Sequence, residues 1–196
     1  MNKFNVKYLL IAFTVLIAVA YSARVETDQE QLSQRLIRLR VVANSDSAAD
    51  QTYKLEVRDR VLDDIAPILD GVSGREEALE RLNAALPALA ESYPDCEVTL
   101  RRQFFPEREY NTFSLPAGEY ASLQLTIGDG EGRNWWCVLF PPLCTEAASA
   151  ENLDAEDAFA MLSEEQVSFI KGESGKYKIK FRIMDLISKI KHFVVE

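Results

Sequence analysis

One stretch of the chain decides its fold: Ile37-Arg-Leu-Arg-Val-Val-Ala-Asn44, followed directly by Ser45-Asp46-Ser47. Apolar side chains recur at every second position of the first run, which is typical of a β-strand with one face in a core. Ser47 is followed three residues later by Asp50, a weakened form of the capping box that begins helices. We therefore predict a strand at 37–44 and a helix over roughly 48–69, joined by a short polar turn.

The region that follows predicts one more helix and three more strands. Leucines spaced for one helical face predict a helix from about residue 73 to residue 93, which Pro87 must kink or interrupt. Alternating patterns predict strands at 97–104, 120–127 and 134–140. This order predicts an α+β fold, with a mixed sheet of about four strands and two helices on one face.

Two turns complete this predicted domain. Pro116-Ala117-Gly118 has the proline and glycine placement of a type II turn, which needs a positive φ at its third position. The glycine-rich loop at 128–133 joins two strands, whereas a phosphate-binding loop opens onto a helix. We interpret it as a flexible connection that makes the last two strands a hairpin.

The two ends of the chain differ from its centre. Lys3 and Lys7 precede the uncharged run 8–20, which is shorter than the roughly 20 apolar residues that a spanning helix needs. We interpret residues 1–22 as a signal peptide, with an uncleaved N-terminal anchor as the alternative. The polar, charged residues of 23–36 predict a helical lead-in, and the α+β domain occupies 37–144.

The C-terminal segment, 145–196, has two parts of opposite charge. Residues 145–166 contain seven acidic residues and no Lys or Arg, which predicts an acidic linker. Residues 176–193 contain six basic residues and one acid, and their apolar positions fall on one side of a helix. This basic amphipathic helix either lies on an anionic membrane surface or packs on its own domain.

The composition excludes several classes of function. With 22 Lys plus Arg against 31 Asp plus Glu, the formal net charge of −9 argues against nonspecific nucleic-acid binding. One His and three Cys leave little material for a histidine-based triad or a zinc cluster. We therefore predict no catalytic residues, no metal and no cofactor.

The predicted helix at 48–69 has an unusual inward face, because its first turns are ionic and the later ones apolar. Charged groups in such a place must be paired or lie at the rim of the protein. One interpretation is a partner-binding site, and the other is a network of caps and salt bridges that fixes the strand-to-helix turn. The residues concerned are Asn44, Asp46, Asp50, Lys54 and Arg58.

A second candidate region is the run Asn134–Cys144, which contains both tryptophans and two of the three cysteines. Alternation sends Trp135 and Trp136 to opposite faces of a strand, so that one lies in the core and the other is available as a contact. We predict a disulfide between Cys137 and Cys144. Cys96 is left without an assigned partner.

Several of these motifs together resemble the stage II sporulation protein R family. They are the 37–47 run, the positions Asp50-Gln51, Lys54-Leu55 and Val57-Arg58-Asp59, and the segments Phe105–Arg108, Leu115–Tyr120 and Asn134–Cys144. The resemblance covers about residues 1–144. The chain reads Leu39-Arg40-Val41 where the family usually reads Leu-His-Val, so an activity that needed that imidazole is in doubt here.

The resemblance implies a signalling role. Family members are exported from the forespore into the space between the two membranes that separate it from the mother cell. There they trigger a membrane-embedded aspartic peptidase that removes the pro-segment of the sporulation factor sigma-E. The alternatives that remain are a secreted cell-wall hydrolase using acids such as Asp46, Asp50 or Glu119, and a structural envelope protein.

Overall fold

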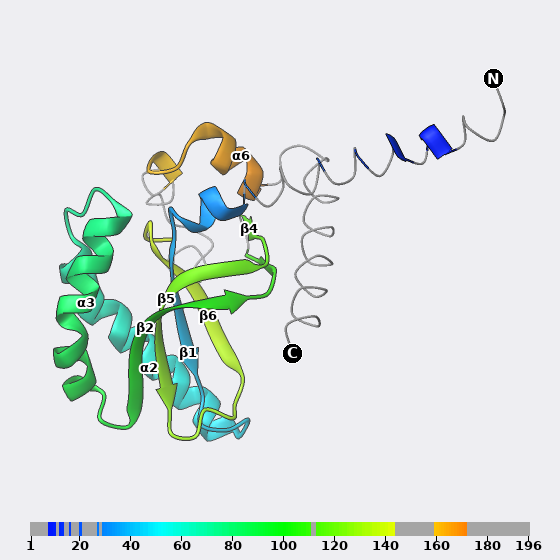
Figure 1. Cartoon of the computed structure of the whole chain (residues 1–196). Coiled ribbons are helices and arrows are strands. Elements are labelled where there is room, and N and C mark those ends of the chain that lie inside the picture. Colours follow the sequence, from blue (N-terminus) through cyan, green and yellow to red (C-terminus); the bar gives the residue numbers. More distant parts are fainter. Residues whose placement is uncertain are drawn as a thin grey trace.

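A mixed four-stranded sheet forms the centre of the protein, with its strands in the order β2-β5-β1-β6 (Figure 1). The computed structural model describes residues 29–110, 113–143 and 159–171, together with isolated residues between 8 and 27. The strands of the sheet are β1 (Ile37–Val42), β2 (Cys96–Phe105), β5 (Gly118–Ile127) and β6 (Asn134–Phe140). The predicted α+β class and mixed sheet are confirmed.

The first strand lies between the last two. β1 pairs in parallel with β5, where Leu39 is opposite Leu123, and antiparallel with β6, where Leu39 is opposite Cys137. The predicted hairpin of the last two strands is therefore wrong, because β1 separates them. The antiparallel neighbour of β5 is β2, which pairs with it from Cys96 to Phe105.

The two predicted helices both form. α2 (Ala48–Leu69) begins after Ser47, whose side chain accepts a hydrogen bond from the Asp50 amide, as expected of an N-cap. α3 (Arg75–Ser92) follows a break at Gly71, whose φ is 67°. The helix continues through Pro87, so the predicted interruption there did not occur.

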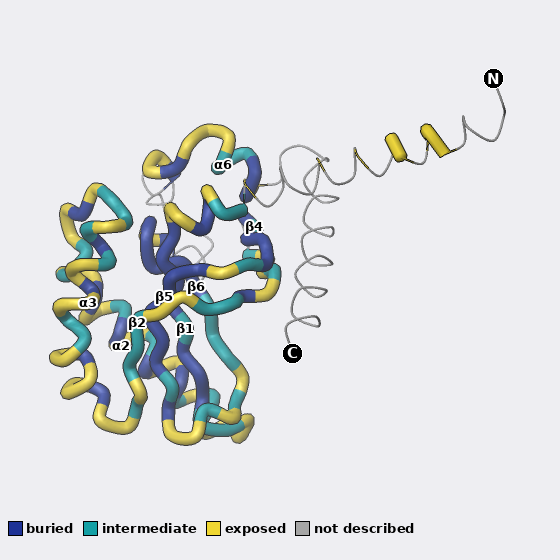
Figure 2. Tube along the Cα trace, viewed as in Figure 1, coloured by how far each residue is buried: buried dark blue, intermediate teal, exposed yellow. Residues whose placement is uncertain are grey.

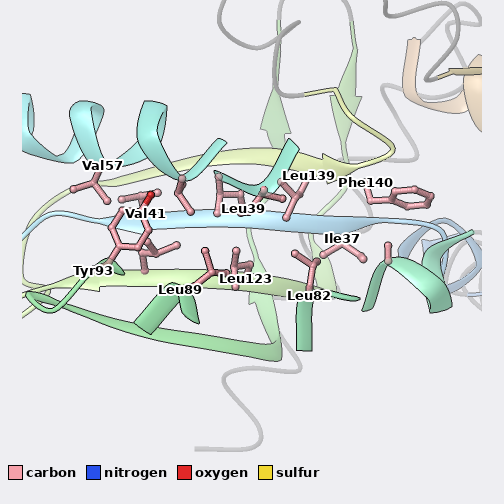
Figure 3. Close-up of a cluster of buried hydrophobic side chains, with 14 of the residues drawn as sticks. Ile37, Leu39, Val41, Val57, Leu82, Leu89, Tyr93, Leu123, Leu139 and Phe140 are labelled. Carbon is pink, nitrogen blue, oxygen red and sulfur yellow. The ribbon is translucent and has the colours of Figure 1, made fainter. Parts of the chain in front are cut away.

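Both helices lie against one face of the sheet, which we call the helix face (Figure 1). Alternate residues of β1, the matching residues of β5 and one side of each helix form its core (Figure 3). Burying such side chains is the main favourable contribution to folding, at roughly 25 cal/mol for each Å² of apolar surface. The core includes Ile37, Leu39, Val41, Val57, Val61, Ile65, Leu82, Leu89, Leu123 and Leu125.

The opposite face of the sheet has a second core at one end only. This core is built by the lead-in, the two-stranded β3–β4 ribbon (Arg108–Glu109 and Ser114–Leu115) and α6 (Glu164–Lys171). Leu32 and Leu36 contribute from the lead-in, and Phe169 and Ile170 contribute from α6. The sequence did not predict the ribbon or α6, which begins in the last residues of the predicted acidic linker (145–166) and extends beyond it.

The turn before β5 is not the predicted type II turn. Gly118 is not among the glycines with positive φ, which are Gly71, Gly128 and Gly130. Gly118 instead begins β5, and a Cβ atom there would collide with the Gln29 side chain. The glycine therefore lets the end of the flexible Gln29 side chain lie against the sheet, and its backbone conformation does not call for glycine.

The burial pattern separates a covered centre from an exposed rim, as Figure 2 shows. Most of the predicted signal segment, Cys144 and the predicted basic helix lie outside the described residues, so these predictions stay as stated. Within the described part of the chain, no helix has both the length and the apolar character needed to cross a bilayer.

Candidate functional site

The predicted site residues meet at the junction where β1 ends and α2 begins. Asn44 donates from Nδ2 to Asp50 Oδ2 at 3.2 Å, and its Oδ1 accepts from the Asp129 amide at 3.0 Å. Its backbone carbonyl accepts from the Glu131 amide at 3.0 Å. One side chain thus ties the end of β1 to both α2 and the β5–β6 loop.

The β5–β6 loop is fastened to the same junction. Asp46 Oδ1 accepts from the Arg133 amide at 2.8 Å, and the Arg133 side chain lies 3.4 Å from the same oxygen. Both side chains of this ion pair are well exposed, so its contribution to stability is small. The loop is therefore held in place at several points, in contrast to the flexible connection that the sequence suggested.

Asp50 is the acceptor at the centre of the junction. Besides Asn44, the Ser45 hydroxyl donates to its Oδ2 at 2.5 Å, while its own amide donates to the Ser47 hydroxyl at 3.1 Å. The hydrogen bonds from Ser45 and Asn44 hold the pKa of the Asp50 carboxyl below its ordinary value, because they stabilise the charged form. Asp50 is thus an ionised anchor for the turn.

Lys54 is a buried cation with two acceptors. Its Nζ donates to Gln51 Oε1 at 2.7 Å and to the Arg133 carbonyl at 3.0 Å, and the residue is 6% exposed. Burial, followed by repulsion from Arg133 and Arg58, lowers the pKa of the ammonium. Gln51 in turn donates to the Ser45 carbonyl at 3.0 Å, so the contacts of Lys54 return to the start of the helix.

Arg58 lies outside the hydrogen-bond network of the junction and contacts Asp59 and Trp135 instead. Its guanidinium forms a salt bridge with Asp59 at 2.6 Å and lies 5.1 Å from the centre of the Trp135 ring, within the range of a cation–π interaction. Trp135 is partly buried against the core of the helix face. Arg58 and Trp135 therefore form a separate, partly exposed pair at the β6 edge.

The two tryptophans do lie on opposite faces of β6. Trp136 packs against the second core, with its ring 6.3 Å from that of Phe105, and the Arg108 guanidinium lies 5.1 Å from its ring. Each tryptophan is thus partly buried, and an arginine guanidinium lies over its ring. Cys137, the next residue of β6, is fully buried. Because Cys144 lies outside the described residues, the disulfide between them remains a prediction.

The structure favours the network interpretation for Asn44, Asp50 and Lys54, because their polar atoms are used internally. Sequence reasoning missed Arg133, whose amide, carbonyl and side chain all belong to the network. Only the pairing order brings this loop to the end of β1, and no local pattern near Arg133 predicts that. Asp46, Arg58 and Trp135 keep surface that a partner could contact.

The chain also has a polar pocket away from this junction. It has a volume of about 720 Å³ and lies between the lead-in and the start of α3, where Arg35 and Arg75 are among its lining residues. None of the predicted site residues lines it.

The fold and the junction define a small α+β domain whose most polar region is an internally bonded strand-to-helix turn. The sequence profile of the family described as stage II sporulation protein R matches residues 33–150. The chain is also 38% identical over 138 residues to the stage II sporulation protein R of Bacillus subtilis (strain 168). That match covers 62% of this chain and 62% of the relative. No solved structure matches.

The chain belongs to the stage II sporulation protein R family. The match includes the whole sheet, α2 and α3, and ends before α6 begins. The family is named for sporulation rather than for an enzymatic activity.

Proposed function

We propose that this protein is an exported signal of sporulation that activates a membrane-embedded aspartic peptidase, which then processes the sigma-E precursor. In this proposal the protein acts in the space between the forespore and the mother cell, as the family resemblance implies. The observation that carries the proposal is membership of the stage II sporulation protein R family over residues 33–150.

The geometry supports recognition rather than acid–base chemistry at the junction. A general acid that works near neutral pH needs a raised pKa, whereas hydrogen bonds lower the pKa of Asp50. Glu119 stands opposite Phe104 in the β2–β5 ladder, away from the strand-to-helix turn. Asp50 therefore lacks the raised pKa that a general acid needs, and Glu119 does not lie beside it.

Arg58 and Trp135 form a partly exposed pair within the predicted contact region, where Asp46 is the more exposed residue. Arginine and tryptophan are enriched among residues that dominate protein–protein interfaces, because each offers a large, rigid contact surface. The Arg58 side chain is 19% exposed and is already ordered by Asp59. We propose this pair, together with Asp46, as a contact with the peptidase.

The test is sigma-E processing in sporulating cells that carry this chain as their only family member. Arg58→Glu is expected to abolish processing while secretion and thermal stability of the protein stay normal. Glu56→Arg is the matched control, since this residue is exposed on the same helix and should leave processing unchanged. Asp50→Lys should also abolish processing, but its stability must be measured because Asp50 anchors the turn.

Normal processing by both the Arg58 and the Asp50 variants would remove the junction from the proposal. A strain that lacks the chain and still processes the precursor would overturn the proposed function itself. Purified protein that releases fragments from peptidoglycan would favour the hydrolase instead.

A further inference from the structure

The face of the sheet opposite α2 and α3 carries arginines that form no salt bridge with a carboxylate of the described residues. Arg38 and Arg40 of β1 and Arg101 of β2 all project from this face, as the two-residue period of the strands requires. Nothing in the junction uses them. We call the part of this face around Arg40, Arg101, Gln103 and Gln124 the cationic face.

Two guanidinium groups converge over β5. Arg40 comes from β1 and donates from Nη1 to Gln103 Oε1 on β2 at 3.1 Å, so its side chain crosses β5. Arg101 comes from β2 on the other side and donates to Gln124 Oε1 at 3.4 Å. The acceptors of both are neutral amide oxygens, which do not compensate a positive charge.

Arg40 is a partly buried cation with a second cation nearby. Its Nε donates to Asn134 Oδ1 at 2.8 Å, which is again a neutral acceptor. Burial, followed by repulsion from Arg101, lowers the pKa of the Arg40 guanidinium. Both causes mean that the folded protein holds this cation at a cost that a nearby anion would reduce.

Arg38 shows the same excess of donors over acceptors further along β1. It is 0% exposed, and its Nη2 donates a hydrogen bond to the Tyr110 hydroxyl at 2.6 Å. Among the described residues, its Nε and Nη1 have no hydrogen-bond partner, and neither has Gln103 Nε2 or Trp136 Nε1. Within the described residues, every buried side-chain polar atom that lacks a partner is a nitrogen donor.

Acidic residues are scarce on this face, although acids exceed bases in the whole chain. None of Arg38, Arg40 and Arg101 forms a salt bridge among the described residues, where the five ion pairs lie elsewhere. Glu97 is on the same face of β2, but it is opposite Thr126, whereas Arg101 is opposite Ser122. The cationic face is therefore a concentrated positive patch on a protein of net charge −9.

We propose that the cationic face binds an acidic segment of a protein partner, with a partner carboxylate held between Arg40 and Arg101. Planar guanidinium groups bind carboxylates in a two-point geometry, and neighbouring amide groups such as those of Gln103 and Gln124 add polar contacts. The inference rests on the proposed function, because the natural partner would be the peptidase, and it assigns a contact surface distinct from Arg58 and Trp135.

An acidic protein segment fits this face better than a membrane surface does. Arg40 is only partly exposed and Gln124 is 6% exposed, so a ligand must extend a side chain toward the strands to reach them. A polypeptide with spaced carboxylates can do so, whereas a bilayer presents its anionic headgroups in a broad layer. The experiment must therefore distinguish binding of an acidic protein segment from binding of lipid at this face.

The binding experiment uses the purified full-length chain and a labelled peptide of alternating Thr and Glu, compared with one of alternating Thr and Gln. We expect the acidic peptide alone to bind, and Arg40→Gln combined with Arg101→Gln to weaken it by about 10- to 100-fold, typical of losing charge-assisted contacts. The control is Arg60→Gln combined with Arg102→Gln, which removes the same charge from other surfaces and should change affinity less than threefold. Equal losses in both double variants would overturn the proposal.

Vesicles containing phosphatidylglycerol provide the second arm of this experiment. The proposal expects any vesicle binding to be insensitive to the Arg40 and Arg101 substitutions. Vesicle binding that falls with those substitutions, without binding of the acidic peptide, would assign the face to lipid and overturn the proposal.

In cells, Arg40→Glu combined with Arg101→Glu should abolish sigma-E processing while the secreted protein keeps its melting temperature. The control pair Arg60→Glu and Arg102→Glu should process normally. Normal processing by the first pair would overturn the proposal that the cationic face contacts the peptidase, and would leave the proposed function unaffected. Processing without the chain would overturn the proposed function, and the peptide experiment would still decide whether the face binds acids.

Discussion

The two faces of the sheet have opposite characters, although they are formed by the same strands. On the helix face, alternate residues from Ile37 to Val41 lie in a continuous apolar core with α2 and α3 (Figure 3). On the opposite face, Arg38 and Arg40 occupy the positions between them. An apolar core covers that face only near the lead-in, the β3–β4 ribbon and α6.

This difference separates stability from recognition. The helix face contains the side chains whose burial stabilises the domain, and it offers little free surface. The opposite face holds cations with neutral acceptors, an arrangement that adds little stability and leaves charge available to a partner. Substitutions on neighbouring residues of one strand can therefore test the two roles separately.

The largest expected effect comes from adjacent residues of β5. Leu123 is 0% exposed in the helix-face core, and Leu123→Ala should lower the free energy of unfolding by about 3 kcal/mol. Gln124→Ala, on the opposite face, should lower it by about 1 kcal/mol, because it removes the side-chain hydrogen bonds with Arg101 and Thr126 but little apolar contact. Urea unfolding of both variants measures the difference, and equal losses would contradict the division of roles.

A smaller effect is expected at Arg38. Arg38→Ala leaves a cavity beside Phe105 and Tyr120, whose rings lie 4.2 and 5.2 Å from the guanidinium carbon. We expect a loss of about 2 kcal/mol. Arg38→Met fills the same space without a charge and should be neutral or slightly stabilising. A large destabilisation by Met in thermal unfolding would show that the fold itself requires the buried charge.

The loss of stability at alkaline pH tests one buried tyrosine on each side of the sheet. Burial raises the pKa of Tyr93, helped by its hydrogen bond to Asp64, and burial raises the pKa of Tyr120. The unfolded chain therefore loses these protons near pH 10 while the folded protein keeps them, so stability should fall as the pH rises above about 10. Tyr93→Phe and Tyr120→Phe should each reduce that fall in urea unfolding at pH 9–11, compared with pH 7.

The smallest expected effect is at the strand-to-helix junction. The pKa of Asp50 is lower in the folded protein than its ordinary 3.8, so its contribution is complete above that pH and is lost as the pH falls through the folded value. Asp50→Asn should therefore flatten the acid limb of the stability curve. The control is Asp129→Asn, which changes an exposed carboxylate in the loop. An acid limb unchanged by Asp50→Asn would contradict the anchoring role.

The elements with strong periodic patterns could be predicted from the sequence. Alternation at 37–42 and the serine cap before α2 are local signals, and both elements form where they were expected. The lead-in and α6 lacked such signals, because Leu32 and Phe169 are recognisable as core residues only when a distant surface meets them. The short β3 and β4 strands contain too few residues for any period.

The sheet order and the environment of the candidate site could not be predicted, because they depend on pairing between distant strands. Asn44 and Asp50 are neighbours in sequence, and a local cap was among their interpretations. Arg133 reaches them only because β6 lies beside β1. For the same reason, the convergence of Arg40 and Arg101 needs the order β2-β5-β1, which no single strand encodes.

The place of β1 also dictates when the domain can be completed. Ile37 pairs with Ala121 on one side and with Phe140 on the other, so both neighbours of β1 are synthesised after α2, α3 and β2. Such distant pairings make folding slow and leave the sheet unfinished until the end. If the chain is exported as proposed, and export begins before β6 has been made, it would have no closed sheet to unfold during passage through a translocation pore. The sheet would then assemble on the far side.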